Sequence, residues 1–324
     1  MRFDRLDLNL LVALDALLEE RSVSAAAQRL HLSQPAVTGS LNRLRDYFGD
    51  QLLVLSGRRM LPTPKAEELA GPVRRALLQI RAEITRPGDF DPLTASRRFH
   101  LVLSDYAYTI LFAHVMAAAA QQAPGISFDV SPPDSRSVER LERAETDLFV
   151  TVANFCIGKH PQLPLFRDDE VVICWPGAGH GKLDADAFFG AGHAIATFGS
   201  ERRSTLADGA IEAMERERRV EMIVPSFGAL PQAVVGTRRL ATMHRLYAEH
   251  FATHYPIEIR PAPFALPQIV EIAQWHQLRE RDPGLKWLIT LVKEQCARRL
   301  GASSLVRLEG TGAEQDPAAI TPHA

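Results

Sequence analysis

The sequence contains little cysteine and no long apolar run. Cys156, Cys174 and Cys296 are odd in number and far apart in a chain of 324 residues, so they form neither a disulfide framework nor a metal-ligand spacing. The most apolar stretch, residues 106–120, includes His114 and is too short to span a bilayer. Charged residues at positions 2, 4, 5 and 7 leave no signal-peptide pattern. We therefore expect a cytoplasmic protein with no membrane partner.

Motifs for catalysis and cofactor binding are also missing. No GxGxxG follows a predicted strand, and neither a P-loop nor an HExxH helix occurs. The glycine-rich residues 177–181 lack a helix-opening phosphate signature, and no serine stands in a nucleophile-elbow context. His244, His250 and His254 are close in sequence, but only Glu249 joins them as a candidate ligand. We therefore expect no catalytic residue, no metal, no cofactor and no enzymatic activity.

The formal net charge of −2 conceals an uneven distribution of charge. Between residues 21 and 59, six arginines stand against two aspartates, whereas the chain beyond residue 90 is acidic overall. A basic segment on an acidic body suits a protein that meets phosphates at one end only, although most charged runs are simply solvated surface. Any nucleic-acid interface is therefore expected in the first 60 residues.

The N-terminal residues carry three helical patterns and one hairpin pattern. Residues 8–18 repeat apolar side chains with helical period, and Ser22 or Ser24 can cap a second helix that contains three consecutive alanines. Ser33 can cap a third helix with Pro35 in its first turn and with apolar residues at 37, 41 and 44 on its inner face. Residues 52–55 predict a strand, and residues 56–59 predict a basic hairpin turn.

Two short helices joined by a tight turn and followed by a wing are suited to binding DNA. The second helix places its N-terminal side chains against base edges in the major groove, where Gln and Asn can bond adenine and Thr offers a hydroxyl and a methyl group. The helix start suits a phosphate oxygen, and the wing lies beside the backbone. The predicted DNA-binding residues are Ser33, Gln34, Pro35, Thr38, Asn42, Arg43, Arg58 and Arg59. The alternative is an ordinary three-helix corner whose polar face is only solvated.

Specific strings in this region favour the DNA-binding motif over an ordinary three-helix corner. AAAQRLHLSQPAV at 25–37, LNRLR at 41–45 and FGD at 48–50 resemble the signature of LysR-type transcriptional regulators. Other strings of this chain are similar to the nodulation-protein-D branch of that family and to its aromatic-degradation relatives. They are RF at 2–3, LDLNLLVALDAL at 6–17, LPTPKAE at 61–67, FDP at 90–92 and RF at 98–99. Many family members carry an arginine just before the wing, where this chain has residues 54–56 without one. Arg58 and Arg59 are therefore the better candidates for contacts between the wing and phosphates.

A long helix is predicted to begin at Thr63 and Pro64. An apolar seam runs along one face of it, through Leu69, Val73, Leu77, Ile80 and Ile84. The family resemblance implies an antiparallel dimer contact between two such linker helices. The alternative is that the seam packs on its own chain. Residues 85–91, which are followed by Pro92, predict a hinge.

Beyond the hinge, strand patterns alternate with helical patterns. Strands are expected at 99–103, 126–130, 147–152, 171–175 and 193–197, which favours a mostly parallel sheet. The family implies two such sub-domains, like a periplasmic binding protein, with a ligand cleft between them. The expected fold is therefore α+β and multidomain, with a winged helix-turn-helix over 1–63, a linker (dimerisation) helix and hinge over 64–90, an α/β effector domain over 91–305, and a disordered tail over 306–324.

In open α/β sheets, ligands bind beyond the carboxyl ends of the strands. Asp105, at such a position, repels an anion by roughly a kcal/mol, whereas aromatic side chains there can stack on a planar ring. The sequence therefore favours a neutral or phenolic aromatic effector, unless these residues are ordinary caps and core aromatics. The predicted effector-binding residues are Ser104, Asp105, Tyr106, Thr151, Asn154, Phe198, Ser226 and Phe227.

Together, these patterns predict a sequence-specific DNA-binding transcriptional regulator controlled by a small aromatic effector. Its expected partners are double-stranded DNA, the effector, RNA polymerase and further copies of the chain, as a homodimer or homotetramer. The competing interpretation is a solute-binding or enzymatic α/β domain fused to a DNA-binding head. The missing signal peptide argues against the first form of this alternative, and the missing catalytic motifs argue against the second.

Overall fold

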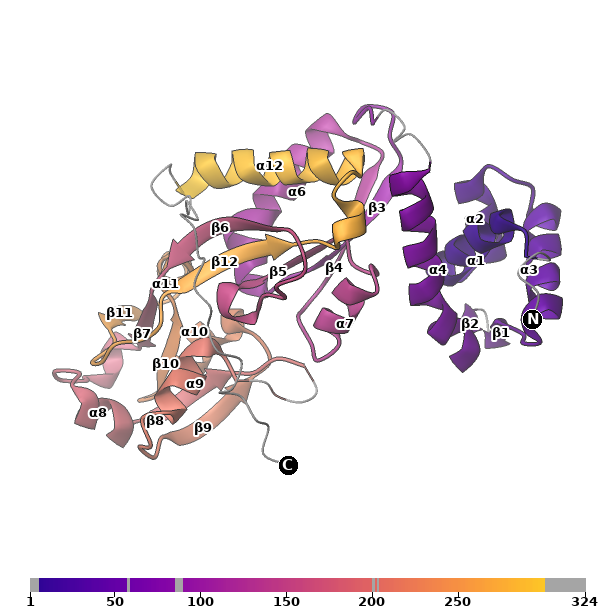
Figure 1. Ribbon diagram of the computed structural model, residues 1–324. Helices are drawn as coiled ribbons and strands as arrows, with labels where there is room; N and C mark the ends of the chain where they lie inside the picture. Colours follow the sequence, from indigo (N-terminus) through magenta and orange to yellow (C-terminus); the bar gives the residue numbers. More distant parts are fainter. Residues whose placement is uncertain (1–5, 57–58, 85–89, 200–201, 203, 301–324) are drawn as a thin grey trace.

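The computed structural model describes residues 6–56, 59–84, 90–199, 202 and 204–300. The predicted hinge, Arg58 and the expected disordered tail fall wholly or mostly outside these residues. An N-terminal unit and a long helix are joined to a larger C-terminal domain of two sub-domains (Figure 1). In the described part of the chain, no helix is long and apolar enough to cross a membrane.

The N-terminal unit is a winged helix-turn-helix, as predicted. It contains α1 (Leu8–Glu20), α2 (Val23–Leu30) and α3 (Gln34–Phe48), followed by the antiparallel strands β1 (Leu53–Ser56) and β2 (Arg59–Pro62). The side chains of Asp7, Ser22 and Ser33 cap the three helices in turn by accepting backbone N–H groups. The helices enclose a core of fully buried leucine, alanine and valine side chains, among them Leu14, Leu17, Ala26, Val37, Leu41 and Leu44.

The tight turn between α2 and α3 depends on one residue with positive φ. His31 adopts φ 54° and ends α2, because its N–H bonds back to the carbonyls of Ala27 and Gln28. Ser33 then starts α3 two residues later with extended backbone. The short connection fixes the angle at which α3 leaves α2.

The predicted linker helix is α4 (Pro64–Glu83), and Thr63 caps it. Val73 and Leu77 are each only 6% exposed and belong to the core of the N-terminal unit. That half of the apolar seam therefore packs on its own chain, which was the alternative to a dimer contact. Ile84, at the C-cap of α4, is 77% exposed. Figure 1 shows α4 between the N-terminal unit and the C-terminal domain.

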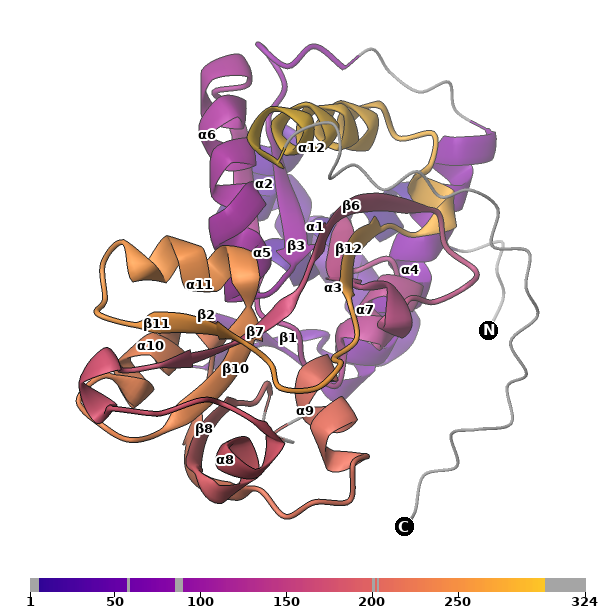
Figure 2. The same ribbon diagram turned by 90° about the vertical axis from the view of Figure 1, so that its left-hand side faces the viewer.

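The first sub-domain is a five-stranded sheet with strand order β4-β3-β5-β12-β6. Its strands are β3 (Arg97–Val102), β4 (Ile126–Ser131), β5 (Leu148–Val152), β6 (Gln162–Asp168) and β12 (Ile269–Gln274). The helical elements of this sub-domain are α5 (Asp105–Ala107), η2 (Tyr108–Phe112), α6 (Ala113–Gln122), α7 (Ser137–Glu142), η3 (Ala153–Phe155), η6 (Gln277–Arg279) and α12 (Pro283–Leu300). The helices α6 and α12 lie together beside this sheet in both views (Figures 1 and 2).

The second sub-domain is another five-stranded sheet, with strand order β11-β7-β10-β8-β9. Its strands are β7 (Glu170–Cys174), β8 (Gly192–Ala196), β9 (Arg219–Val224), β10 (Leu240–His244) and β11 (Glu258–Pro261). Its helical elements are η4 (Pro176–Ala178), α8 (Ala185–Gly190), α9 (Leu206–Glu212), η5 (Phe227–Ala229), α10 (Leu230–Val234) and α11 (Arg245–Ala252).

The expectation of a mostly parallel sheet holds for four of the five strands in each sub-domain, but each sheet is mixed because one strand runs against the others. In the first, β3 pairs in parallel with β4 and β5, but β12 is antiparallel to both β5 and β6. In the second, β8 pairs in parallel with β9 and β10, but β7 is antiparallel to β10 and β11. The cause is the chain path, because β6 leads directly into β7 and β12 returns from the second sub-domain to the first. A strand that arrives by such a crossing runs against its neighbours.

Candidate functional site

The predicted DNA-binding residues of α3 share one exposed surface. Gln34, Pro35, Thr38, Asn42 and Arg43 are all exposed, and the Ser33 hydroxyl at the helix start accepts the N–H of Ala36 at 3.3 Å. The Thr38 hydroxyl donates to the carbonyl oxygen of Gln34 at 3.0 Å, which leaves its methyl group and its lone pairs available. These side chains therefore form a polar surface on a helix whose opposite face is buried.

Arg45 has a different role from its neighbours on α3. Its Nε donates to the carbonyl of Gln51 and one terminal nitrogen donates to the carbonyl of Leu53, both at 2.9 Å. Its other terminal nitrogen donates to the Asn42 side-chain oxygen at 3.3 Å. Arg45 thus holds the wing against α3, and Asn42 keeps its amide N–H groups and one lone pair of its oxygen for another partner.

The wing is a two-stranded ribbon in which Ser56 pairs with Arg59. Arg58 and the side chain of Arg59 lie outside the described residues, so their contact with phosphates stays a prediction. Leu55, beside this turn, is 74% exposed.

Gly39 is a position on α3 that the sequence prediction passed over. It lies in the helix interior, is exposed, and has nothing within 4 Å of the place where a side-chain Cβ would stand. By contrast, a Cβ on Gly71 of α4 would come within 3.1 Å of the Arg143 side chain. Gly71 therefore has a packing reason within the chain, whereas Gly39 has none among the described residues.

In the C-terminal domain, the residues after β3 face the second sub-domain. Ser104 caps α5 by accepting the N–H of Ala107 at 3.1 Å. Asp105 reaches the second sub-domain, where its Oδ2 accepts hydrogen bonds from the backbone N–H of Gly228 at 2.7 Å and from the Tyr247 hydroxyl at 3.3 Å. A carboxylate of the first sub-domain therefore joins the two sub-domains at this point.

The three predicted aromatic side chains near this contact form one cluster. Tyr106 is fully buried and packs 4.2 Å from the His244 ring, measured between ring centroids. Phe227 packs on the same histidine at 4.5 Å and on the half-buried Phe198 at 4.9 Å. Ser226 directly precedes Phe227 and is half-buried. The structure thus brings these predicted residues together, with their rings packed on protein.

Thr151 and Asn154 belong to β5, which pairs with β3, and to the helical turn η3 that follows it. Thr151 is on β5 opposite Ile272, and Asn154 is exposed in η3. Neither makes a hydrogen bond to the second sub-domain within the described residues.

A group of buried ionisable residues, which sequence reasoning missed, lies where β6 leads into β7. The Tyr106 hydroxyl donates to Asp168 at 2.7 Å, and His244 lies 3.0 Å from Glu170. Burial raises the pKa of Glu271 to about 7, although the charge of His244 opposes the shift. Acidic residues inside otherwise apolar strand patterns were the available signal for this cluster.

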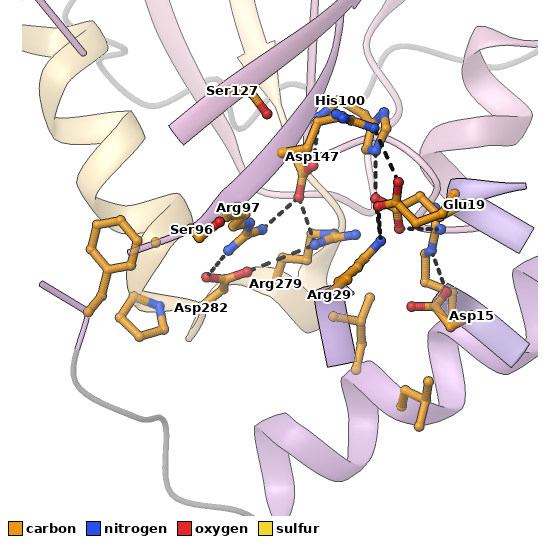
Figure 3. Close-up of a pocket in the computed structure, with 18 of the residues that line it drawn as sticks. Asp15, Glu19, Arg29, Ser96, Arg97, His100, Ser127, Asp147, Arg279 and Asp282 are labelled. Atoms are coloured by element: carbon orange, nitrogen blue, oxygen red, sulfur yellow. Dashed lines mark hydrogen bonds and ion pairs between the residues drawn. The ribbon is translucent and has the colours of Figure 1, made fainter. Parts of the chain in front are cut away.

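A second network joins the N-terminal unit to the first sub-domain around a pocket of about 870 Å³ (Figure 3). Arg74 of α4 bonds Asp15 at 3.1 Å and Glu19 at 3.2 Å on α1, and it also donates to the carbonyl of Glu145 at 3.5 Å. The other carboxylate oxygen of Glu19 lies 3.1 Å from Nε2 of His100 on β3. Burial alone would raise the pKa of Glu19, but His100, Arg29 and Arg74 lower it to about 2. Glu19 is therefore charged when it contacts the C-terminal domain.

The network continues from His100 into the first sub-domain. The backbone N–H of His100 donates to Asp147 at 2.8 Å, and Asp147 lies 2.7 Å from both Arg97 and Arg279 (Figure 3). Arg97 also bonds Asp282, which precedes α12, at 2.7 Å. A connected set of charges therefore runs from α1 to the start of α12. No grouping of His, Cys, Asp and Glu suited to a metal ion occurs among the residues that the structure describes.

Comparison with known proteins gives one consistent result. Residues 8–67 match the family "Bacterial regulatory helix-turn-helix protein, lysR family", and residues 94–297 match "LysR substrate binding domain". The chain is similar to Nodulation protein D 1 of Bradyrhizobium sp. (strain NC92), with 37% identity over 95% of this chain and 98% of that protein. It is 38% identical to Nodulation protein D 2 of Rhizobium tropici, over 96% of this chain and 100% of that one.

Among solved structures, a probable transcriptional regulator from Pseudomonas aeruginosa has the same arrangement. It superposes with a TM-score of 0.70 at 29% identity and covers 90% of this chain and 98% of its own.

Proposed function

Since this chain belongs to the LysR family of transcriptional regulators, we propose that it contacts operator DNA through Ser33, Gln34, Pro35, Thr38, Asn42 and Arg43 of α3 and responds to a phenolic or other uncharged aromatic effector. The family and the relatives are DNA-binding transcriptional regulators with an effector domain, not enzymes. The enzymatic and solute-binding interpretations are therefore set aside.

One observation carries the DNA-binding proposal, namely that α3 exposes a continuous polar face while its other face is locked in the core. Gln34 and Thr38 are one helical turn apart near the start of α3, at the end that enters the major groove in this class of motif. The Arg43 side chain is 62% exposed and has only a 3.6 Å contact with the half-buried Asp7, so a phosphate or a guanine edge can replace that partner at low cost. Arg58 and Arg59 of the wing are proposed to meet the adjacent backbone.

The effector proposal rests on the side chains that meet between the two sub-domains. Phe198 and Phe227 supply apolar ring surface, and Asp105 supplies a negative charge beside it. The proposed set is completed by Ser104, Tyr106, Thr151, Asn154 and Ser226. An uncharged ring is favoured because it gains stacking without meeting the repulsion of Asp105.

The charge network around Glu19 supports a route from effector to DNA. Glu19 on α1 contacts His100 on β3. His100 stands two residues after Arg98 and four residues before Ser104 of the proposed effector site. An effector that binds one arrangement of the sub-domains tenfold better shifts the equilibrium by about 1.4 kcal/mol. Since His100 lies on β3 and Ser104 follows that strand closely, such a shift would change how the N-terminal unit is held.

Assembly and further partners are also part of the proposal. We propose a homodimer or homotetramer that uses the exposed part of α4, including Ile84, because Val73 and Leu77 are already occupied by the chain itself. RNA polymerase is the proposed downstream partner, and the cytoplasm, where bacterial DNA lies, is the proposed compartment.

The test of the DNA contacts replaces Gln34 or Thr38 by Ala. Each change is expected to weaken specific binding by about 1–3 kcal/mol and to leave non-specific binding nearly unchanged. The measurement is fluorescence anisotropy at one fixed salt concentration, on an operator fragment selected from random DNA by the wild-type protein. Gln121→Ala, an exposed position on α6, is the matched control. Wild-type affinity in both α3 variants would contradict the assignment.

A further inference from the structure

Asp105 connects the two sub-domains of the C-terminal domain through its side chain. It comes from α5 in the first sub-domain, and both donors to its Oδ2, the Gly228 N–H at 2.7 Å and the Tyr247 hydroxyl at 3.3 Å, belong to the second. A backbone amide and a hydroxyl that converge on one carboxylate oxygen are the groups that a binding site uses to hold a carboxylate ligand. Here the carboxylate is covalently part of the chain.

Gly228 leaves room for this contact. A Cβ on Gly228 would lie 2.9 Å from the Tyr247 hydroxyl and 3.1 Å from Oδ2 of Asp105, so a side chain there would displace the groups that make the contact. Burial raises the pKa of Tyr247 to about 12, the contact with Thr109 opposes the shift, and the charge of Asp105 adds to it. Tyr247 therefore remains protonated and able to donate.

The other oxygen of the same carboxylate is not used. Oδ1 of Asp105 is buried and has no hydrogen-bond partner within the described residues. Leaving a charged acceptor buried without a donor is costly, and groups of this kind in native proteins call for an explanation. A ligand that brings a hydroxyl to this atom would remove the penalty.

We propose that Asp105 acts as a built-in carboxylate ligand that clasps the two sub-domains together, and that its Oδ1 is the acceptor for a hydroxyl group of the effector. The place where a carboxylate ligand would bind is already filled by the chain. The proposed effector site therefore selects hydrogen-bond donors, such as phenols, and rejects small carboxylates. The clasp stands on the contacts above, whereas the acceptor role rests on the proposed effector site.

The clasp is tested by removing the Asp105 carboxylate by mutation and then supplying a small carboxylate, formate, from solution. In the full-length Asp105→Ala protein, hydrogen exchange of the peptide that covers residues 226–230 is expected to speed up about tenfold or more, because the Gly228 N–H loses a charged acceptor. Sodium formate in the millimolar range is expected to slow it again in this variant and to have no effect on the wild type. Asp105→Asn keeps an acceptor oxygen and should lie between the two.

Two results would overturn the clasp, namely unchanged exchange in Asp105→Ala or an equal effect of formate on both proteins. Exchange of residues 34–48 serves as the internal reference, since a variant that misfolds would also lose protection in α3. The acceptor role is tested with phenol against anisole, which lacks the donor. Phenol is expected to protect residues 226–230 of the wild type further and to do so less in Asp105→Ala. If phenol and anisole change the exchange of residues 226–230 equally, or not at all, the acceptor role is overturned. The proposed contacts with operator DNA are tested separately, by the α3 variants.

Discussion

Replacing Gly39 by Ala should stabilise α3 and weaken its binding to DNA. Glycine in an exposed helix interior costs about 0.5–1 kcal/mol relative to alanine, because its backbone loses more freedom on folding. Nothing in the described structure contacts a Cβ at this position, so the variant gains this stability without a clash. At about 0.8 kcal/mol, amide exchange in α3 should slow roughly fourfold.

The opposite effect is expected on DNA. Gly39 follows Thr38 in the part of α3 proposed to enter the major groove, where base edges approach the helix backbone closely. An added methyl group would hold the helix away from them. We expect specific affinity to fall at least tenfold, which corresponds to about 1.4 kcal/mol, as measured by anisotropy on the selected operator fragment.

Gly209 provides a matched control for this experiment. It lies in α9, is exposed, and also has nothing within 4 Å of the place where a Cβ would stand, but α9 is in the second sub-domain. Gly209→Ala should stabilise its own helix without any change in affinity for DNA. The reasoning is refuted if Gly39→Ala gains helix stability and binds the operator as tightly as the wild type, because Gly39 would then lie away from the DNA.

Two further predictions concern the C-terminal domain. In thermal-shift measurements, phenols should stabilise the wild type more than benzoate does. Phe198→Ala should reduce the thermal shift that phenols cause and should retain operator binding in the absence of effector. A larger shift with benzoate than with phenols would contradict the proposed chemistry. Glu271 has its pKa raised from 4.5 to about 7 by burial, so its ionisation costs stability that grows as the pH rises from 4.5 to 7. In urea denaturation, the free energy of unfolding of Glu271→Gln should therefore match that of the wild type at pH 4.5 and exceed it by up to about 3 kcal/mol at pH 8. Equal free energies of unfolding at pH 8 would show that ionised Glu271 does not destabilise the fold.

Local patterns in the sequence were sufficient to predict the helices and the hairpin of the N-terminal unit. The caps at Ser22 and Ser33, the apolar face of α3 and the hairpin after it depend on residues within a few positions of one another, so short-range spacing predicts them. The exposed polar face of α3 follows from the same periodicity. The family strings add the expectation of two sub-domains, which the sheet order confirms.

Contacts between distant residues were decided only by the tertiary structure. Arg45 turns from α3 to the wing, Val73 packs into the core of the N-terminal unit, and β12 enters the first sheet antiparallel after the chain has passed through the second sub-domain. The hydrogen bond from Gly228 to Asp105 joins positions 123 residues apart, and the contact of His100 with Glu19 joins positions 81 apart. No periodicity encodes such pairings, because they depend on where whole sheets and helices come to rest against one another, and many arrangements of the same elements satisfy the local pattern equally well.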